Sequence, residues 1–311
     1  MRQRMRGILG LLGLCLLTAV SAAAQEAKAL RRIVVAEQQS AREILEQLRQ
    51  GASFSALARA RSIGPEVRTW GYVGVVQPRD LQPELRQVVV KLKEGQVSDV
   101  LESGGQFVLV KVISPKIEQH FEAADRAERA RQMPQALQEL QAALRLEMDN
   151  VPAYIKLGLL QQATKQFDEA VRSLEKAQQY APHDVQITLL IASAYTHAAT
   201  TGKNKTQAEK AIEVFHKALQ QDERYAPSVN FGLGKIYLMA LQQPERALSY
   251  LEKAAEASKN VPEVHRLLIQ ACYDTKRYDQ AWQRMRRAQE LGFEFPELLK
   301  ALQKVKQQSQ R

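Results

Sequence analysis

A repeated spacing of alanines in the second half of the chain restricts the fold more than any other feature of this sequence. Five segments each place an alanine, a large apolar residue four positions later, and a second alanine three positions after that. The first alanines of these segments are Ala136, Ala170, Ala211, Ala247 and Ala281. They follow one another at intervals of 34, 41, 36 and 34 residues. Such an interval predicts stacked helical hairpins, because one hairpin cannot bury its apolar stripe alone and neighbours must share a core.

Each of the middle segments follows a second apolar stretch, so the repeating unit contains two helices. These stretches are YIKLGLL (154–160), LLIASAY (189–195) and FGLGKIY (231–237), and each carries a glycine or alanine that allows close packing. The extra residues of TTGKNKTQ (200–207) are interpreted as a longer loop that explains the 41-residue interval. Residues 116–294 therefore resemble a tetratricopeptide-repeat (TPR) array of about five hairpins. Residues 295–311 are predicted to form a capping helix and tail, which such arrays need.

The resemblance to TPR arrays implies a concave groove, lined by the first helix of each hairpin, that binds polypeptide clients or partner proteins. The family register assigns to this groove Ile155, Leu159, Leu189, Phe231, Lys235, Arg266 and Gln270. The alternative that several of these side chains only pack between repeats remains open at this stage. The register positions hold no cluster of Lys, Arg and Asn suited to a partner's terminal carboxylates, so the ligand is not identified.

Residues 25–115 have a different pattern, which predicts a small α+β domain before the all-α repeats. RRIVVA (31–36) and QFVLVKVIS (106–114) are apolar, β-branched runs and predict two strands. Three helices are predicted between them, in SAREILEQLRQG (40–51), FSALARA (54–60) and QPELRQVVVKL (82–92). Ser40 is expected to cap the first helix, since Glu43 follows three residues later.

The order of these segments resembles the parvulin-type peptidyl-prolyl isomerase (rotamase) domain. The resemblance is carried by QLRQGASFSALA, the RSI turn, the loop glycines Gly71 and Gly74, LQPEL, LKEGQVSDV and a last strand ending in VKV. It implies an enzyme that speeds rotation about X–Pro bonds, whose barrier is about 18–20 kcal/mol. Such enzymes hold the proline in an apolar pocket and favour a twisted amide, and they need no cofactor or metal.

The sequence departs from the family at every polar position of that site. Active parvulins resemble one another in two histidines and a Cys or Asp, and these positions hold Arg32, Val108 and Gly64 here. An acid found between the loop glycines is replaced by Tyr72. The positions of the apolar pocket hold Leu81, Leu85, Val90 and Phe107. These replacements predict a domain that still holds a peptide but has lost most or all isomerase activity, unless the apolar residues only fill a core.

The N-terminus has the three parts of an export signal. MRQRMR is basic, GILGLLGLCLLTAV is apolar and SAAA offers small residues for cleavage, so residues 1–24 are predicted to be removed. Lipid attachment is not expected, because Cys15 follows Leu14 rather than a small residue. Removal takes three arginines and no acid, which lowers the net charge from +10 to +7. The remaining charges are mixed along helices, so neither nucleic-acid binding nor an integral membrane segment is expected.

The sequence thus predicts an exported polypeptide-binding protein, chaperone-like or a scaffold, in the bacterial periplasm or secreted. The alternative is an active peptidyl-prolyl isomerase whose repeats recruit substrate or a partner. A third hypothesis treats the parvulin-like part as a structural cap for the array. No metal site is expected, because the five histidines are scattered along the repeats without ligand spacing. The single cysteine that remains, Cys272, excludes an intramolecular disulfide, and the oligomeric state is not predicted.

Overall fold

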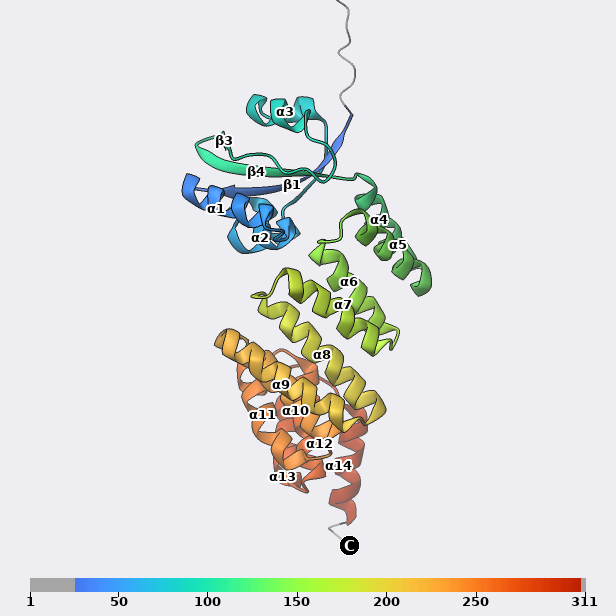
Figure 1. The fold of residues 1–311 in the computed structure, drawn as a ribbon. Helices are drawn as coiled ribbons and strands as arrows, with labels where there is room; N and C mark the ends of the chain where they lie inside the picture. Colours follow the sequence, from blue (N-terminus) through green and yellow to red (C-terminus); the bar gives the residue numbers. More distant parts are fainter. Residues whose placement is uncertain (1–25, 309–311) are drawn as a thin grey trace, which may run out of the picture. The chain divides into compact units, whose positions relative to one another are not determined.

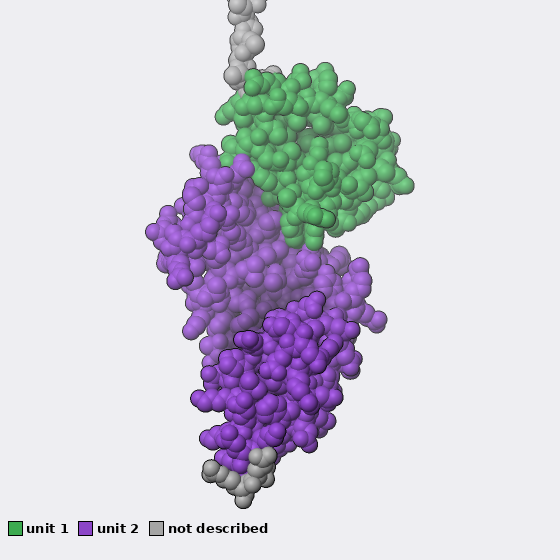
Figure 2. All heavy atoms as spheres, turned by 180° about the vertical axis from the view of Figure 1, so that it is seen from behind, with its two compact units in different colours: residues 1–115 green, residues 116–311 purple. Residues whose placement is uncertain are grey.

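The structure, a computed structural model, describes residues 26–308, so the predicted export signal lies outside the described residues. The chain forms two compact units that divide after Pro115, namely Met1–Pro115 and Lys116–Arg311 (Figure 1, Figure 2). Each unit has its own hydrophobic core. Across residues 26–308, no helix has both the length and the hydropathy needed to cross a membrane.

The first unit is built on a four-stranded antiparallel sheet in the order β2-β1-β4-β3. The strands are β1 (Lys28–Val35), β2 (Tyr72–Val76), β3 (Leu101–Ser103) and β4 (Gln106–Ile113). The two strands predicted from β-branched runs, β1 and β4, form the centre of the sheet. Their register pairs Arg32 with Val110 and Val34 with Val108. The edge strands β2 and β3 were not predicted.

Helices cover both faces of this sheet. Figure 1 shows α1 (Gln38–Arg49) and α2 (Phe54–Arg61) on one face and α3 (Pro83–Val89) on the other. Because side chains alternate along a strand, Ile33 packs with the α1 and α2 side while Val34 packs with the α3 side. The predicted cap at Ser40 is wrong: α1 begins at Gln38, and Glu37 precedes it without a side-chain cap.

The second unit is a series of antiparallel helical hairpins, which confirms the predicted fold class. The hairpins are α4 (Lys116–Arg129) with α5 (Met133–Leu146), α6 (Val151–Ala163) with α7 (Phe167–Tyr180), α8 (Val185–Gly202) with α9 (Lys205–Gln221), α10 (Ala226–Lys235) and the π turn η4 (Ile236–Ala240) with α11 (Pro244–Ala257), and α12 (Pro262–Asp274) with α13 (Tyr278–Glu290). A last helix, α14 (Pro296–Gln308), buries Leu302 against the final hairpin. Both alanines of every repeated segment are completely buried.

The 41-residue interval has a different origin from the one predicted. TTGKNKTQ is not a long loop, because Thr200–Gly202 extend α8 and Lys205–Gln207 extend α9. Lys203 makes the turn alone with a φ of 48°, and Asn204 caps α9 by accepting a hydrogen bond from Gln207 N at 3.2 Å. The extra residues therefore lengthen both helices of the third hairpin.

A one-residue insertion in the fourth hairpin takes the form of the π turn η4. Gly158 and Ala170 of the second hairpin lie 12 positions apart, whereas Gly234 and Ala247 lie 13 apart. In both hairpins a leucine of the second helix packs directly on the glycine, where a Cβ would approach its Cγ to 2.7 or 2.6 Å. The π turn absorbs the additional residue and preserves this contact on either side of it.

Candidate functional site

The three residues predicted to stand at the polar catalytic positions of active parvulins come together on the α3 face of the sheet. Arg32 and Val34 lie two positions apart on β1, so their side chains point to the same face of the sheet. Val34 pairs directly with Val108 on β4. Gly64 lies against Val34, since a Cβ at Gly64 would stand 3.1 Å from Val34 Cγ2. The structure therefore brings Arg32, Gly64 and Val108 into one neighbourhood, although their side chains do not form a polar network with one another.

The loop between α2 and β2 is fixed along β1 by backbone hydrogen bonds. Ile63 N donates to Val34 O at 2.8 Å, and Arg32 N donates to Gly71 O at 2.7 Å. Within the loop, Gly71 N donates to Glu66 O at 2.8 Å across the short helix η1 (Pro65–Thr69). This segment thus extends the edge of the sheet and holds Glu66 over the candidate site.

An ion pair lies at the position predicted for the family's first catalytic histidine. The Arg32 guanidinium donates to Glu66 Oε1, and the two side chains are only 29% and 13% exposed. Within the described part of the chain, Arg32 Nε and Glu66 Oε2 have no hydrogen-bond partner. A Cβ at Gly64 would come within 2.9 Å of Glu66 Oε2, so a Cys or Asp there would displace this carboxylate. Sequence reasoning missed Glu66, which is 34 positions from its partner.

Replacing Arg32 with methionine is expected to lower the free energy of unfolding of the first unit by about 2 kcal/mol, because Glu66 would keep a poorly solvated charge without its partner. The double variant R32M/E66L should recover most of this loss. Urea unfolding followed by Trp70 fluorescence in a Trp282→Phe background measures it. Arg49→Met is the matched control, since the Arg49–Asp99 pair is exposed, and it should cost at most about 0.5 kcal/mol. Equal losses for R32M and R49M would contradict the prediction.

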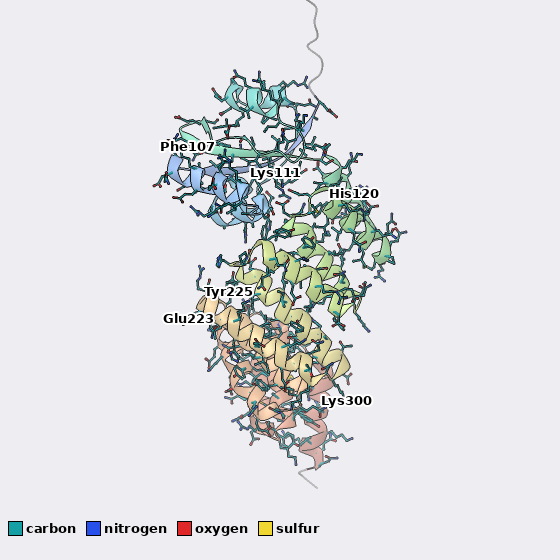
Figure 3. All side chains as sticks on the ribbon, viewed as in Figure 1. Phe107, Lys111, His120, Glu223, Tyr225 and Lys300 are labelled. Carbon is teal, nitrogen blue, oxygen red and sulfur yellow. The ribbon has the colours of Figure 1, made fainter. Side chains whose placement is uncertain are left out.

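The four residues predicted to form the proline pocket do not lie together. Leu81 and Leu85 pack with Val108 in the aliphatic cluster under α3, where Leu85 is 5% exposed. Val90 is 37% exposed, and Val89 takes the buried position instead. Phe107, labelled in Figure 3, packs on the opposite face with α1 and α2. The α3 face therefore carries an aliphatic cluster, with Leu85 and Val108 buried in it and no aromatic member.

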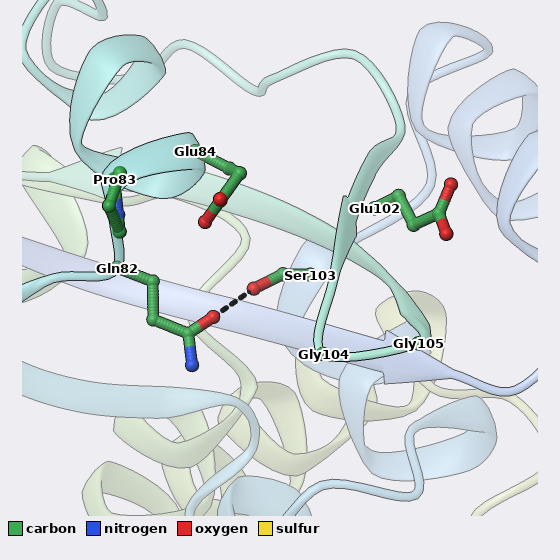
Figure 4. A pocket seen from close by; sticks show the side chains of 7 residues that line it. All are labelled: Gln82, Pro83, Glu84, Glu102, Ser103, Gly104 and Gly105. Carbon is green, nitrogen blue, oxygen red and sulfur yellow. Dashed lines mark hydrogen bonds between the residues drawn. The ribbon is translucent and has the colours of Figure 1, made fainter.

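A hollow that borders α3 and the β3–β4 turn is polar. Its volume is about 560 Å³, and Gln82, Pro83, Glu84, Glu102, Ser103, Gly104 and Gly105 line it (Figure 4). Ser103 Oγ donates to Gln82 Oε1 across it, as the dashed line in Figure 4 marks. This hollow offers hydrogen-bonding groups rather than the apolar surroundings that a proline ring prefers.

The residues predicted for the TPR groove occupy equivalent positions on the first helices of successive hairpins. Ile155, Leu189 and Phe231 each lie three positions before the small residue of their helix (Gly158, Ala192 or Gly234), and Leu159, Ser193 and Lys235 each lie one position after it. In α12 the bulky Ile269 takes the corresponding place, 12 positions before Ala281, with Arg266 three positions before it and Gln270 one position after. Leu159 is 42% exposed, whereas Arg266 pairs with Glu263 and Gln270 Nε2 donates to Asp274 Oδ1 at 2.7 Å. These positions change from apolar in α6 to polar or charged in α12.

Three of the predicted groove residues line one cavity of about 200 Å³: Leu189, Phe231 and Lys235. Sequence reasoning missed the others, which are Ser193, Thr196, His197, Phe215, Ser228 and Gly232. Ser193 and His197 were detectable from the sequence, because they lie four and eight positions after Leu189 on the same face of α8. The part of the chain described by the structure has no cluster of three or more His, Cys, Asp or Glu that could hold a metal ion.

The first unit is a four-stranded sheet with helices on both faces and the second a series of helical hairpins, and comparison with known families assigns each of them. Residues 19–114 match the family of PPIC-type peptidyl-prolyl isomerase (rotamase) domains. Residues 151–184 and 238–305 match tetratricopeptide-repeat families. The chain therefore contains a PPIC-type parvulin domain and, in its C-terminal region, TPR repeats, which confirms both predicted resemblances.

Two curated relatives carry the name Chaperone SurA. The one from Nitrosospira multiformis is 31% identical over 135 residues, and the one from Bordetella avium is 37% identical over 81 residues. These matches cover 42% and 26% of this chain but only 29% and 16% of the relatives, so the chain spans less than a third of either.

Two solved structures are similar to parts of this chain. A crystal structure of a PpiC-type peptidyl-prolyl cis-trans isomerase domain is 27% identical and covers 29% of this chain and 90% of that domain, with a TM-score of 0.27. A structure of Pseudomonas aeruginosa pilF is 19% identical and covers 61% of this chain and 84% of that one, with a TM-score of 0.49.

Proposed function

We propose that this chain is an exported polypeptide-binding protein, chaperone-like or a scaffold, whose parvulin domain has lost substantial isomerase activity and whose TPR repeats bind polypeptide. The observation that carries the proposal is the Arg32–Glu66 ion pair, which lies where the family's polar residues are expected. The Glu66 carboxylate lies so near Gly64 that a Cβ there would come within 2.9 Å of it. Isomerisation needs a site that stabilises the twisted amide more than the planar one. An aliphatic cluster beside an Arg32–Glu66 pair lacks the two histidines and the Cys or Asp that active parvulins place there.

Several further observations support polypeptide binding. Both relatives are named chaperones, and repeat arrays of this kind present extended concave surfaces. The groove positions Ile155, Leu159, Leu189 and Phe231 place apolar side chains on three successive first helices. Export is proposed from the basic, apolar and small-residue parts of residues 1–24, with the periplasm as the compartment.

A prolyl-isomerisation assay on residues 25–311 tests the enzymatic half of this proposal. We expect no acceleration above the uncatalysed rate for a panel of short X–Pro peptides, because the groups that favour a twisted amide are replaced. Suppression of aggregation of a chemically unfolded client, measured by light scattering in parallel, should still be observed. The matched control is a family member with both histidines, assayed on the same peptides.

The alternative is an active peptidyl-prolyl isomerase, and the intact PPIC-type domain favours it. Clear acceleration by the unmodified chain would establish that reading and refute the proposed loss of activity. In that case Arg32→Met and Glu66→Gln should each change the rate if the ion pair takes part. A chain that neither accelerates isomerisation nor suppresses aggregation would refute polypeptide binding as well.

A further inference from the structure

The cavity in the TPR unit has the size and the walls of a pocket for one large apolar side chain. Leu189 from α8 and Phe231 from α10 line it together with the ring of Phe215 from α9, and its volume is about 200 Å³. The Phe215 ring packs against Gly232, where any side chain would clash, because a Cβ would come within 2.1 Å of Phe215 Cζ. An apolar pocket of this volume suits a single phenylalanine, leucine or methionine side chain.

A cation stands at the edge of this apolar pocket. Lys235 lies one helical turn beyond Phe231 and lines the same cavity, and the π turn η4 begins at the next residue. Among the described residues, Lys235 forms no ion pair. Glu263, whose pKa is lowered chiefly by its hydrogen bond with Arg266 and also by the Lys235 charge, is bound by Arg266 through two hydrogen bonds of 2.6 and 2.7 Å. An ammonium without an ion-pair partner beside an apolar pocket favours a carboxylate on the molecule that enters it.

The other titratable group of the cavity does not cancel this charge. Burial lowers the pKa of His197, and the neighbouring Lys235 ammonium lowers it further, so the imidazole is neutral at pH 7. His197 Nδ1 is held by the carbonyl oxygen of Ser193 at 3.0 Å. The cavity thus combines apolar walls, hydroxyl groups and one positive charge.

We propose that this cavity selects client segments in which a large apolar residue stands beside an acidic one. The apolar side chain enters between Leu189, Phe231 and Phe215, and the carboxylate binds the Lys235 ammonium. The exposed side chain of Leu159 on α6 offers a neighbouring apolar contact to the same extended segment. This inference rests on the proposed function and specifies the chemistry of the polypeptide that the repeats bind.

Four fluorescein-labelled peptides test the inference with the full chain. In each peptide, twelve Gly and Ser residues flank a central pair. The pair is Phe-Glu, Ala-Glu, Phe-Gln or Ala-Gln. Fluorescence anisotropy should show that Phe-Glu binds at least about tenfold more tightly than Ala-Glu, because the ring is buried. It should bind about fivefold more tightly than Phe-Gln, and 0.5 M salt should reduce that second ratio.

The protein variant that isolates the charge is Lys235→Gln. It should abolish the preference for Phe-Glu over Phe-Gln while keeping the preference for Phe over Ala. Lys217→Gln is the matched control, because it removes an exposed lysine of α9 that does not line the cavity, and it should retain both preferences. Binding of all four peptides alike, or an unchanged Glu preference in K235Q, would overturn this assignment alone. Failure of every peptide and of an unfolded client to bind would overturn the proposed function too.

Discussion

Replacement of Gly71 with alanine is expected to lower the free energy of unfolding of the first unit by about 4 kcal/mol. Gly71 has a φ of +81°, which an alanine adopts only with strain. A Cβ there would also come within 2.7 Å of Ala58 Cβ and 2.9 Å of Arg32 O. Both neighbours are fixed, because Ala58 belongs to α2 and Arg32 N donates to Gly71 O. The structure must therefore separate the loop from β1 to make room.

Gly74→Ala separates the strain of the backbone from the steric clash. Gly74 has a φ of +112°, but nothing lies within 4 Å of a Cβ at that position. This variant should lose only about 1–2 kcal/mol, the cost of the conformation alone. Urea unfolding followed by Trp70 fluorescence in a Trp282→Phe background measures both losses. Equal losses for G71A and G74A would show that the contact between the loop and β1 is not as tight as described.

The parts of the fold that followed from the sequence are those fixed by local periodicity. The alanine pattern predicted the hairpins because every alanine in it must be buried for the helices to pack at this spacing, and every one is. The strands β1 and β4 followed from β-branched runs for a similar reason. The edge strands did not, since β3 has three residues and β2 contains Gly74, so both depend on pairing with a distant partner.

The error at TTGKNKTQ shows tertiary packing overriding local preference. Gly, Asn and three Thr are weak helix formers, and the segment was interpreted as a loop to account for the 41-residue interval. Ala199 and Ala208 on either side are completely buried in the contact between α8 and α9. That packing stabilises α8 as far as Gly202 and α9 from Lys205 onward. Between them, Lys203 adopts the left-handed conformation.

The sequence indicated some residues of the candidate site and missed others. The resemblance assigned Arg32, Gly64 and Val108 to one site; the strand register brings Arg32 near Val108, and the loop that Ile63 N ties to Val34 O brings Gly64 beside them. The assignment of Phe107 to the same pocket ignored alternation, because neighbours on a strand point to opposite faces and Val108 already faces α3. No pattern in the sequence indicated Glu66, since its pairing with Arg32 depends on the path of the loop.

Replacement of Asn150 with alanine is expected to destabilise the second hairpin by about 3 kcal/mol. Asn150 is completely buried at the start of α6, where its Oδ1 accepts a hydrogen bond from Ala153 N at 3.0 Å. Its Nδ2 donates to Glu147 Oε2 at 2.8 Å, and Glu147 is only 4% exposed. The variant therefore loses a helix cap and also weakens the hydrogen bonding of a carboxylate that water hardly reaches.

Asn204→Ala is the matched control for this change, because Asn204 caps α9 in the same way but is exposed and has no buried carboxylate partner. It should cost about 1 kcal/mol, the usual worth of a cap. Repeat arrays open locally, so native-state hydrogen exchange at the amides of α6 and α9 measures the two effects where they arise. Protection in α6 should fall about thirtyfold more for N150A than protection in α9 falls for N204A, because the two expected losses differ by about 2 kcal/mol. Equal losses would mean that the Glu147 contact contributes nothing, and that capping alone fixes the start of each helix.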